Sequence, residues 1–187
     1  MILYINSCVR QESRTHQLAQ ALLSKLDGDV TELRLEEIAL EPSDETFLKQ
    51  RDRLIEEGAY AHEMFELARQ FAAADVIVIA APYWDLSFPA SLKQYIEKVC
   101  ANGVTFEYTP EGIPRGLCRA KRMYYVMTAG GDYVPEDYGY GYIRALAGGY
   151  FGITDVRLIK AVGLDIAGAD PEKILQESIR QIRGDQS

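Results

Sequence analysis

Apolar residues gather in five short runs along the chain, and a segment with apolar residues at helical spacing follows each run. The runs are interpreted as buried strands at residues 2–5, 30–35, 76–81, 122–128 and 155–162. The helical segments are residues 14–26, residues 44–74 with a break at Gly58, the stretch behind Pro89, residues 142–150 and residues 171–183. Strands that alternate with helices are typical of a parallel sheet covered on both faces. The sequence therefore predicts a three-layer α/β fold with a doubly wound sheet of five strands in the order 2-1-3-4-5.

The third run and the loop behind it are central to the functional interpretation. Residues 76–81 are apolar and rich in β-branched side chains, as a strand buried on both faces would be. Pro82 ends the run, and Pro89 stands where the first turn of the next helix is expected. In the predicted order the switch point lies between strands 1 and 3. The loops at residues 7–15 and 83–88 should therefore face each other across one cleft.

The loop at residues 7–15 has the composition of a phosphate site. It carries Ser7, Arg10, Ser13, Arg14 and Thr15 just where a helix begins. Unpaired backbone N–H groups and the helix dipole attract anions at such a position, and short hydroxyls add donors. The alternative is that Ser13 is an ordinary N-cap with no ligand nearby. The concentration of hydroxyls and arginines in one loop favours the phosphate interpretation.

The loop behind the third strand has the composition of a site for a flat ring. It begins Pro82, Tyr83, Trp84, Asp85 and Leu86. Aromatic side chains and exposed backbone groups beside a phosphate site suit a heteroaromatic ring better than a small phosphoester. The alternative is that the tyrosine and the tryptophan only cover the core.

A third loop follows the fourth strand and should lie next to the second. It consists of Thr128, Ala129, Gly130 and Gly131. Paired glycines allow the backbone to approach a ligand closely, and the alternative is a plain tight turn. Three such loops at one sheet edge support a shared ligand more strongly than any one of them alone.

Composition excludes several other classes of function. The formal net charge is −8, which argues against nucleic acid and anionic membranes as partners. No apolar run approaches the ~20 residues needed to span a bilayer, and the start of the chain has no basic segment typical of a signal peptide. Three cysteines without paired spacing and two distant histidines predict neither a disulfide framework nor a metal site. We expect one soluble, cytoplasmic domain over residues 1–187.

The first loop also permits a different enzyme. Cys8 and Arg14 are separated by five residues, a spacing that resembles the thiolate loop of low-molecular-weight tyrosine phosphatases. Asp170–Pro171 resembles the dipeptide that this family uses for its general acid. The five intervening residues contain no glycine or asparagine to turn successive amides toward one phosphate. The dipeptide also fits an N-cap followed by a proline at the first helical position. The phosphatase remains an alternative.

Longer stretches of the chain resemble one known family. The sequences PYWDLSFPASLKQYIEKV, NGVTFEYTPEGIPRGL, VMTAGG and YFGITDV resemble, in this order, the flavodoxin-like FMN-dependent azoreductases and quinone reductases. The resemblance extends from residue 2 to about residue 182. It implies FMN bound non-covalently, with its phosphate at Ser7 and residues 13–15. The flavin ring would lie against residues 83–86, and residues 128–131 would line its other side.

The resemblance also implies a homodimer with two active sites at the subunit interface. The segment at residues 101–117 has no clear periodicity, and its Phe106 and Tyr108 would help to form that interface. Three departures from the family concern the site. Asp85 stands where azoreductases often have asparagine, Ala129 replaces a common arginine, and the tyrosine-rich loop at residues 132–141 is divergent.

The resulting prediction is an FMN-dependent oxidoreductase. NAD(P)H would reduce the flavin, and a quinone or an azo compound would then take two electrons. No side chain is assigned as an obligate catalytic acid or base. Besides the phosphatase, a flavodoxin-like electron carrier is an alternative, because its acidic charge would be similar. The first loop lacks the T-x-T-G-x-T sequence of true flavodoxins, which favours the reductase.

Overall fold

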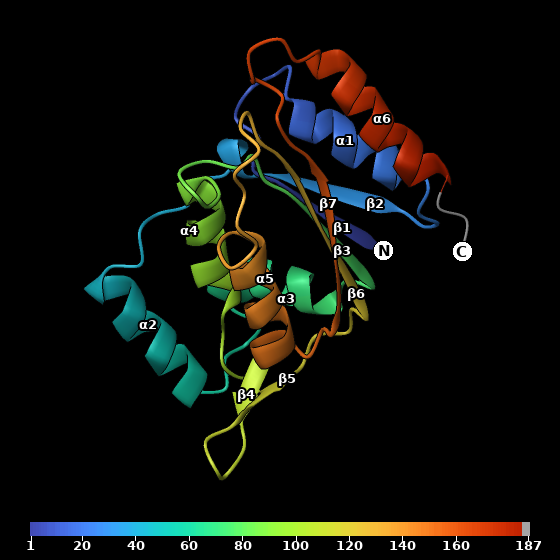
Figure 1. Cartoon of the computed structure of the whole chain (residues 1–187). Coiled ribbons are helices and arrows are strands. Elements are labelled where there is room, and N and C mark those ends of the chain that lie inside the picture. The colour runs from blue at the N-terminus through green and yellow to red at the C-terminus, as the bar shows by residue number, and fades with distance from the viewer. Residues whose placement is uncertain (185–187) are drawn as a thin grey trace.

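Five parallel strands form the central sheet of the computed structural model, which describes residues 1–184 (Figure 1). The strands are β1 (Ile2–Asn6), β2 (Val30–Arg34), β3 (Val76–Ala80), β6 (Arg122–Thr128) and β7 (Asp155–Ala161). Their order is β2-β1-β3-β6-β7. Numbered among themselves they follow the order 2-1-3-4-5, so the predicted doubly wound topology is confirmed. That residues 1–187 form a single domain stays a prediction.

The sheet is apolar on both faces at its centre. Every residue of β1 is buried, and the strand is paired along its whole length with β2 and β3. Leu3 and Ile5 enter the core on one face, and Ile2 and Tyr4 enter the core on the other. Alternation of this kind is what a strand between two helical layers requires.

Two helices cover one face of the sheet and three cover the other (Figure 1). The helices are α1 (Arg14–Leu23), α2 (Glu45–Glu56), α3 (Glu66–Ala73), α4 (Ala90–Val99), α5 (Tyr140–Leu146) and α6 (Pro171–Gly184), with short turns η1 (Leu35–Glu37), η2 (Glu63–Phe65) and η3 (Ala147–Phe151). Leu18 of α1 and Leu175 of α6 enter one core, while α3, α4 and α5 supply Phe71, Leu92 and Ile143 to the other. The helix α2 stands apart from both layers in Figure 1.

Several predicted helix ends are displaced by one to three residues. The helix α1 ends at Leu23 rather than at residue 26, because residues 25 and 26 continue it only through i→i−3 backbone hydrogen bonds. The helix α2 begins at Glu45, one residue later than predicted, behind its N-cap Asp44, whose carboxylate accepts a hydrogen bond of 2.8 Å from the Phe47 N–H. Pro89 is the N-cap of α4 and so precedes the first turn. These shifts leave the layers unchanged.

The fourth helical segment also differs from its prediction. The helix α5 begins at Tyr140, two residues before the predicted start, and its last turn widens into the π-helix η3. Gly148 and Gly149 lie within η3. Glycine is a poor former of regular α-helix, and π-turns of this kind occur mainly as single turns.

The segment without periodicity forms a short hairpin. The antiparallel strands β4 (Phe106–Tyr108) and β5 (Pro114–Gly116) project beyond the end of α5 in Figure 1. Gly116 packs so closely on the backbone of Phe151 that a side chain at this position would collide with it. The hairpin is therefore anchored to the end of η3, while its tip extends away from the body.

A strained two-residue turn follows β3. The Trp84 N–H donates to the Ser87 carbonyl at 3.1 Å, and the Ser87 N–H donates to the Trp84 carbonyl at 2.7 Å. Asp85 and Leu86 between them have φ values of 51° and 65°, as a type I′ turn requires. Such turns favour asparagine, aspartate and glycine, so Asp85 suits its position, whereas Leu86 is strained at its own. A left-handed conformation costs a residue with a side chain about 1–2 kcal/mol.

Neither a membrane span nor a metal cluster is found within residues 1–184. None of the helices in this range is both long and apolar enough to cross a bilayer. The same range brings together no group of three His, Cys, Asp or Glu residues that could hold a metal ion. Cys8, Cys100 and Cys118 are free thiols.

The turn yields a stability test with an internal control. We expect Leu86→Gly to be more stable than Leu86→Ala by about 1 kcal/mol, because only glycine relieves the positive φ. At an ordinary position the order is reversed, since glycine is the less stable of the two. Denaturant unfolding of both variants measures the difference in the free energy of unfolding. An alanine variant that is the more stable one would contradict the strain.

Candidate functional site

Four loops meet around one cleft of about 160 Å³ at the carboxyl end of the sheet. They follow β1, β3, β6 and β7. Nine of the residues predicted from the sequence line this cleft: Ser13, Arg14, Thr15, Pro82, Tyr83, Trp84, Thr128, Ala129 and Gly130. The switch-point argument therefore located a real concavity shared by the three predicted loops.

The start of α1 forms one end of the cleft. The Ser13 hydroxyl accepts a hydrogen bond of 3.3 Å from the His16 N–H, so this serine is the N-cap that the simpler interpretation expected. The first N–H groups of a helix have no partner inside it, which leaves those of Arg14 and Thr15 at the cleft wall. Capping and anion binding are thus compatible at this helix terminus.

A buried hydroxyl pair joins this helix to the neighbouring strand. The Oγ1 atoms of Thr15 and Thr128 lie 2.6 Å apart, and both residues are buried. One hydroxyl must donate to the other, so the pair fixes the start of α1 against the end of β6. The two hydroxyls also give the floor of the cleft a polar surface with remaining hydrogen-bonding capacity.

The loop behind β3 forms the aromatic side of the cleft. The Tyr83 N–H donates to the Thr128 carbonyl at 3.0 Å, which extends the β3–β6 ladder into the loop. The Tyr83 hydroxyl is buried without a partner among the described residues. Burial raises the pKa of this phenol, and the nearby phenols of Tyr133 and Tyr138 raise it further. Trp84 is 42% exposed, so its ring is available at the rim.

The fourth wall was missed by the sequence analysis. Leu164 and Asp165, in the loop after β7, line the cleft. Backbone hydrogen bonds fix this loop along residues 129–131, including a bond of 2.9 Å from the Asp165 N–H to the Gly130 carbonyl. A side chain at Gly130 would collide with the Asp165 carboxylate. The predicted strand order could have identified this loop, since it places strand 5 beside strand 4 and brings the carboxyl end of strand 5 to the same edge of the sheet.

Charges in the cleft are balanced. Arg14 donates to the Asp165 carboxylate at 2.9 Å and lies 3.5 Å from the Leu164 carbonyl. Arg10 and Glu12 also line the cleft. The two cations of this wall therefore face two carboxylates, and one ion pair already engages Arg14. An incoming anion would compete with Asp165 for that guanidinium.

Four predicted site residues do not line the cleft. The Ser7 hydroxyl is buried and donates to the Ala80 carbonyl at 2.8 Å, so it joins β1 to β3. Gly131 lies just beyond the cleft, and its carbonyl accepts from the Gly163 N–H. Asp85 and Leu86 line a neighbouring hollow of about 760 Å³, between the turn and the tyrosine-rich loop. The left-handed turn accounts for an aspartate at position 85 without any contact to a ligand.

Cys8 is unsuited to act as a nucleophile. Its side chain is only 3% exposed and lies in the core beneath α1 rather than on the cleft wall. Burial raises the pKa of this thiol to about 11, whereas catalytic cysteines have a lowered pKa. The Asp170 carboxylate accepts a hydrogen bond of 3.0 Å from the Lys173 N–H, as an N-cap of α6 does. Both features of the phosphatase interpretation therefore have structural explanations.

Comparison with known proteins places the chain in a family. A family model described as a flavodoxin-like fold matches residues 1–184. An FMN-dependent NADH:quinone oxidoreductase of Clostridium perfringens (strain ATCC 13124) is 34% identical over 189 residues, covering 96% of this chain and 94% of that protein. FMN-dependent NADH:quinone oxidoreductase 2 of Clostridium acetobutylicum is 45% identical over 127 residues, which is 65% of this chain and 62% of that protein.

Solved structures agree on the fold. An azoreductase from Bacillus anthracis (strain Sterne) has a TM-score of 0.82 at 24% identity, covering 97% of this chain and 95% of that one. An FMN-dependent NADH-azoreductase from Bacillus anthracis (strain Ames Ancestor), solved with FMN, has a TM-score of 0.80 at 23% identity over 97% and 94% of the two chains. The family model matches residues 1–184, and a relative is 34% identical over 96% of this chain. The chain therefore belongs to the flavodoxin-like fold family.

Proposed function

We propose that the protein is an FMN-dependent NADH:quinone oxidoreductase that also reduces azo compounds. The observation that carries the proposal is the single cleft in which a helix terminus with arginine and hydroxyl groups faces Tyr83 and Trp84. The relatives in Clostridium are named for this activity. Their names supply NADH, rather than NADPH, as the electron donor. The three cysteines are free thiols, which agrees with the reducing cytoplasm that the proposal assumes.

The donor set fits the phosphate of FMN. Amide N–H groups at the start of α1, the guanidinium of Arg14 and the hydroxyls of Ser13 and Thr15 line one end of the cleft. Charged and helix-terminal donors of this kind are the usual ligands of a phosphate group. Gly130 keeps the opposite wall free of a side chain that would collide with Asp165.

The other end fits an isoalloxazine ring at the rim. A volume of about 160 Å³ is below the range of roughly 300–1,000 Å³ that encloses an organic ligand, so the ring would extend out of the cleft past Trp84. The orphan hydroxyl of Tyr83 offers the nearby ring a donor. We therefore assign the phosphate to the α1 side and the ring to the Tyr83–Trp84 side.

The chemistry divides between cofactor and protein. When bound, FMN supplies the acceptor for a hydride from NADH and the donor of two electrons to a quinone. The chain supplies position: the Thr15–Thr128 hydrogen bond and the backbone ladder to Tyr83 hold the two ends of the cleft at a fixed separation. The Tyr83 phenol is protonated at neutral pH, as an ordinary tyrosine is, and can therefore donate a hydrogen bond. No residue is assigned as an obligate acid or base.

Spectroscopy of the purified protein tests the proposed activity. The FMN-loaded protein should absorb near roughly 450 nm, NADH should bleach this band, and a quinone should restore it. Cys8→Ser should keep the same turnover, because the thiol takes no part. A protein that neither binds FMN nor oxidises NADH would contradict the proposal. Flavin binding without turnover of NADH and quinone would indicate an electron carrier instead.

Two substitutions with opposite effects test where the phosphate lies. Arg14→Gln should weaken FMN binding roughly ten- to hundredfold, because a charged hydrogen bond to the phosphate is lost. Asp165→Asn should tighten FMN binding about three- to tenfold, because a competing carboxylate beside a dianion is neutralised. Quenching of flavin fluorescence measures both affinities.

Riboflavin and an outlying arginine provide the controls for this pair. Riboflavin has no phosphate, so neither substitution should change its affinity. Arg180→Gln removes the same charge from the exposed face of α6 and should leave FMN binding unchanged. Equal effects on FMN and riboflavin would place the phosphate elsewhere.

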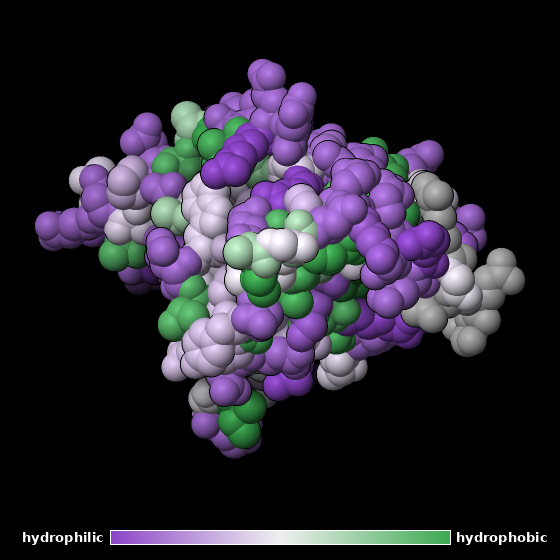
Figure 2. All heavy atoms as spheres, turned by 45° about the horizontal axis from the view of Figure 1, so that its top comes forward, coloured by the Kyte–Doolittle hydropathy of each residue, from purple (hydrophilic) through white to green (hydrophobic). Residues whose placement is uncertain are grey.

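We also propose that the protein is a homodimer with the cleft at the interface. Apolar side chains are exposed on two parts of the surface: Tyr138 is 54% exposed beside the 760 Å³ hollow, and Ile113 is 62% exposed on the hairpin. Figure 2 shows a largely hydrophilic face on which hydrophobic residues form small groups, one of them at the lower tip. Phe106, predicted to take part, is buried against Tyr150, so Tyr108 is the aromatic residue that the hairpin offers.

Sedimentation measures the assembly directly. At micromolar concentration the protein should sediment with twice the mass of one chain, and Tyr138→Asp or Ile113→Asp should shift it toward the monomer. A charge in an apolar interface loses its hydration without gaining a partner. Val30→Asp, at the amino end of β2 and away from the cleft, should remain dimeric and serves as the control. A wild-type monomer under these conditions would refute the dimer.

A further inference from the structure

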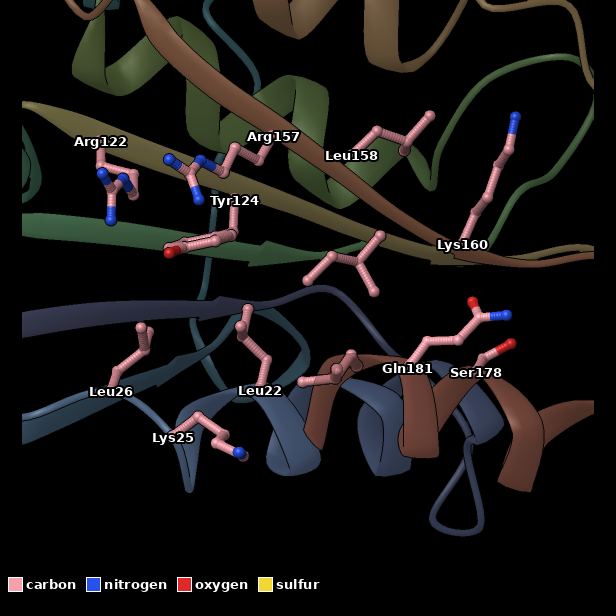
Figure 3. A pocket seen from close by; sticks show the side chains of 12 residues that line it. Leu22, Lys25, Leu26, Arg122, Tyr124, Arg157, Leu158, Lys160, Ser178 and Gln181 are labelled. Carbon is pink, nitrogen blue, oxygen red and sulfur yellow. The ribbon is translucent and has the colours of Figure 1, made fainter. Parts of the chain in front are cut away.

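A second concavity, of about 700 Å³, lies between the sheet and the helices α1 and α6, and it shares no lining residue with the cleft. Its walls are α1, α6, the first half of β6 and residues 157–160 of β7 (Figure 3). The strand β6 runs from this groove at Arg122 to the cleft at Thr128, a separation of roughly 20 Å at about 3.3 Å per residue. The groove is therefore separate from the proposed flavin site, and nothing in the proposed reaction uses it.

One end of the groove is cationic. Arg122 and Arg157 line it together with Tyr124, and Figure 3 shows the three side chains grouped at the same end. Both arginines bind one carboxylate: Asp155 lies 2.5 Å from the Arg122 Nε and 3.0 Å from the Arg157 Nε. Two guanidiniums share a single negative charge, so this end retains a net positive charge.

The sign of this charge contrasts with that of the chain. The net charge of the protein is −8, yet among the described residues no carboxylate lines the groove. Lys25 and Lys160 line its outer margins, where Figure 3 shows them pointing away from the middle, and Lys160 is paired with Glu136. Attraction of an anion therefore depends on the arginine end.

The middle of the groove is apolar. Leu22 of α1, Leu26 from the turn after α1, Ile159 of β7 and Ile182 of α6 line it. Beyond them, Ser178 and Gln181 of α6 offer polar groups at the far end (Figure 3). An apolar wall of this kind with a few polar groups at its ends is the usual make-up of a small-molecule site, and 700 Å³ lies within the usual size range.

We propose that this groove binds a small organic anion with an alkyl or aryl body, such as a medium-chain carboxylate. The anionic head lies against the guanidiniums of Arg122 and Arg157, which match a carboxylate with paired donors. The apolar body lies along Leu22, Ile159 and Ile182. Binding requires no covalent step and is independent of flavin chemistry.

Calorimetric titration with octanoate, octan-1-ol and octylammonium tests the head group. The titrations use the FMN-loaded protein, or the protein as purified if it binds no flavin, so that the result does not depend on the proposed activity. Octanoate should bind at least tenfold more tightly than octan-1-ol, and octylammonium should not bind. Affinity should rise about threefold for each methylene added between hexanoate and decanoate. Equal binding of the alcohol and the carboxylate would overturn the proposal.

A pair of matched variants locates the site. Arg157→Gln should reduce octanoate affinity at least tenfold, whereas Arg180→Gln, on the same side of the molecule but outside the groove, should leave it unchanged. Thermal unfolding confirms that both variants are folded. Equal losses in the two variants, or displacement of octanoate by FMN or by a quinone, would place the ligand elsewhere and refute the assignment.

Discussion

The burial of β1 and β3 on both faces is the constraint on which the rest of the structure depends. Each strand has a helical layer above and below it, so its backbone polar groups are satisfied only by neighbouring parallel strands. Parallel pairing brings all carboxyl ends to one edge, and right-handed crossovers place successive helices on opposite faces when the order reverses at β1. The cleft opens where the connections diverge, because no crossover covers the space between the loops after β1 and β3.

Much of the fold and of the cleft follows from the sequence for this reason. Apolar runs identify the strands, and topology then brings distant loops together without any knowledge of side-chain geometry. The hydrophobic pattern does not show which partner each side chain contacts. Ser7 resembled a phosphate ligand, but its hydroxyl is used to join β1 to β3. Phe106 resembled an interface residue, but it packs on Tyr150. Both residues are satisfied by partners far away in the sequence, which local spacing does not reveal.

Asp165 illustrates a different kind of omission. The loop after β7 has no run of hydroxyls or aromatics, so composition gave it no priority, although the strand order carries it to the same edge. Its position is set by backbone hydrogen bonds to residues 129–131 rather than by any motif. Asp85 has two explanations, since an acidic residue beside aromatics also attracted a functional interpretation. A positive φ at this position explains the residue by backbone conformation alone.

The two ends of the cleft differ in rigidity, and this difference bears on specificity. The α1 end is built from the termini of regular elements and is fixed by a buried Thr15–Thr128 hydrogen bond. The aromatic end rests on a strained two-residue turn and faces a tyrosine-rich loop with Tyr133 and Tyr138 exposed. Interactions with a phosphate need fixed donors, whereas acceptors that stack on a flat surface vary in size and shape. Substitutions near the turn should therefore change which acceptor is reduced while the cofactor stays the same, because the groups that would hold its phosphate belong to α1 and the floor of the cleft rather than to this loop.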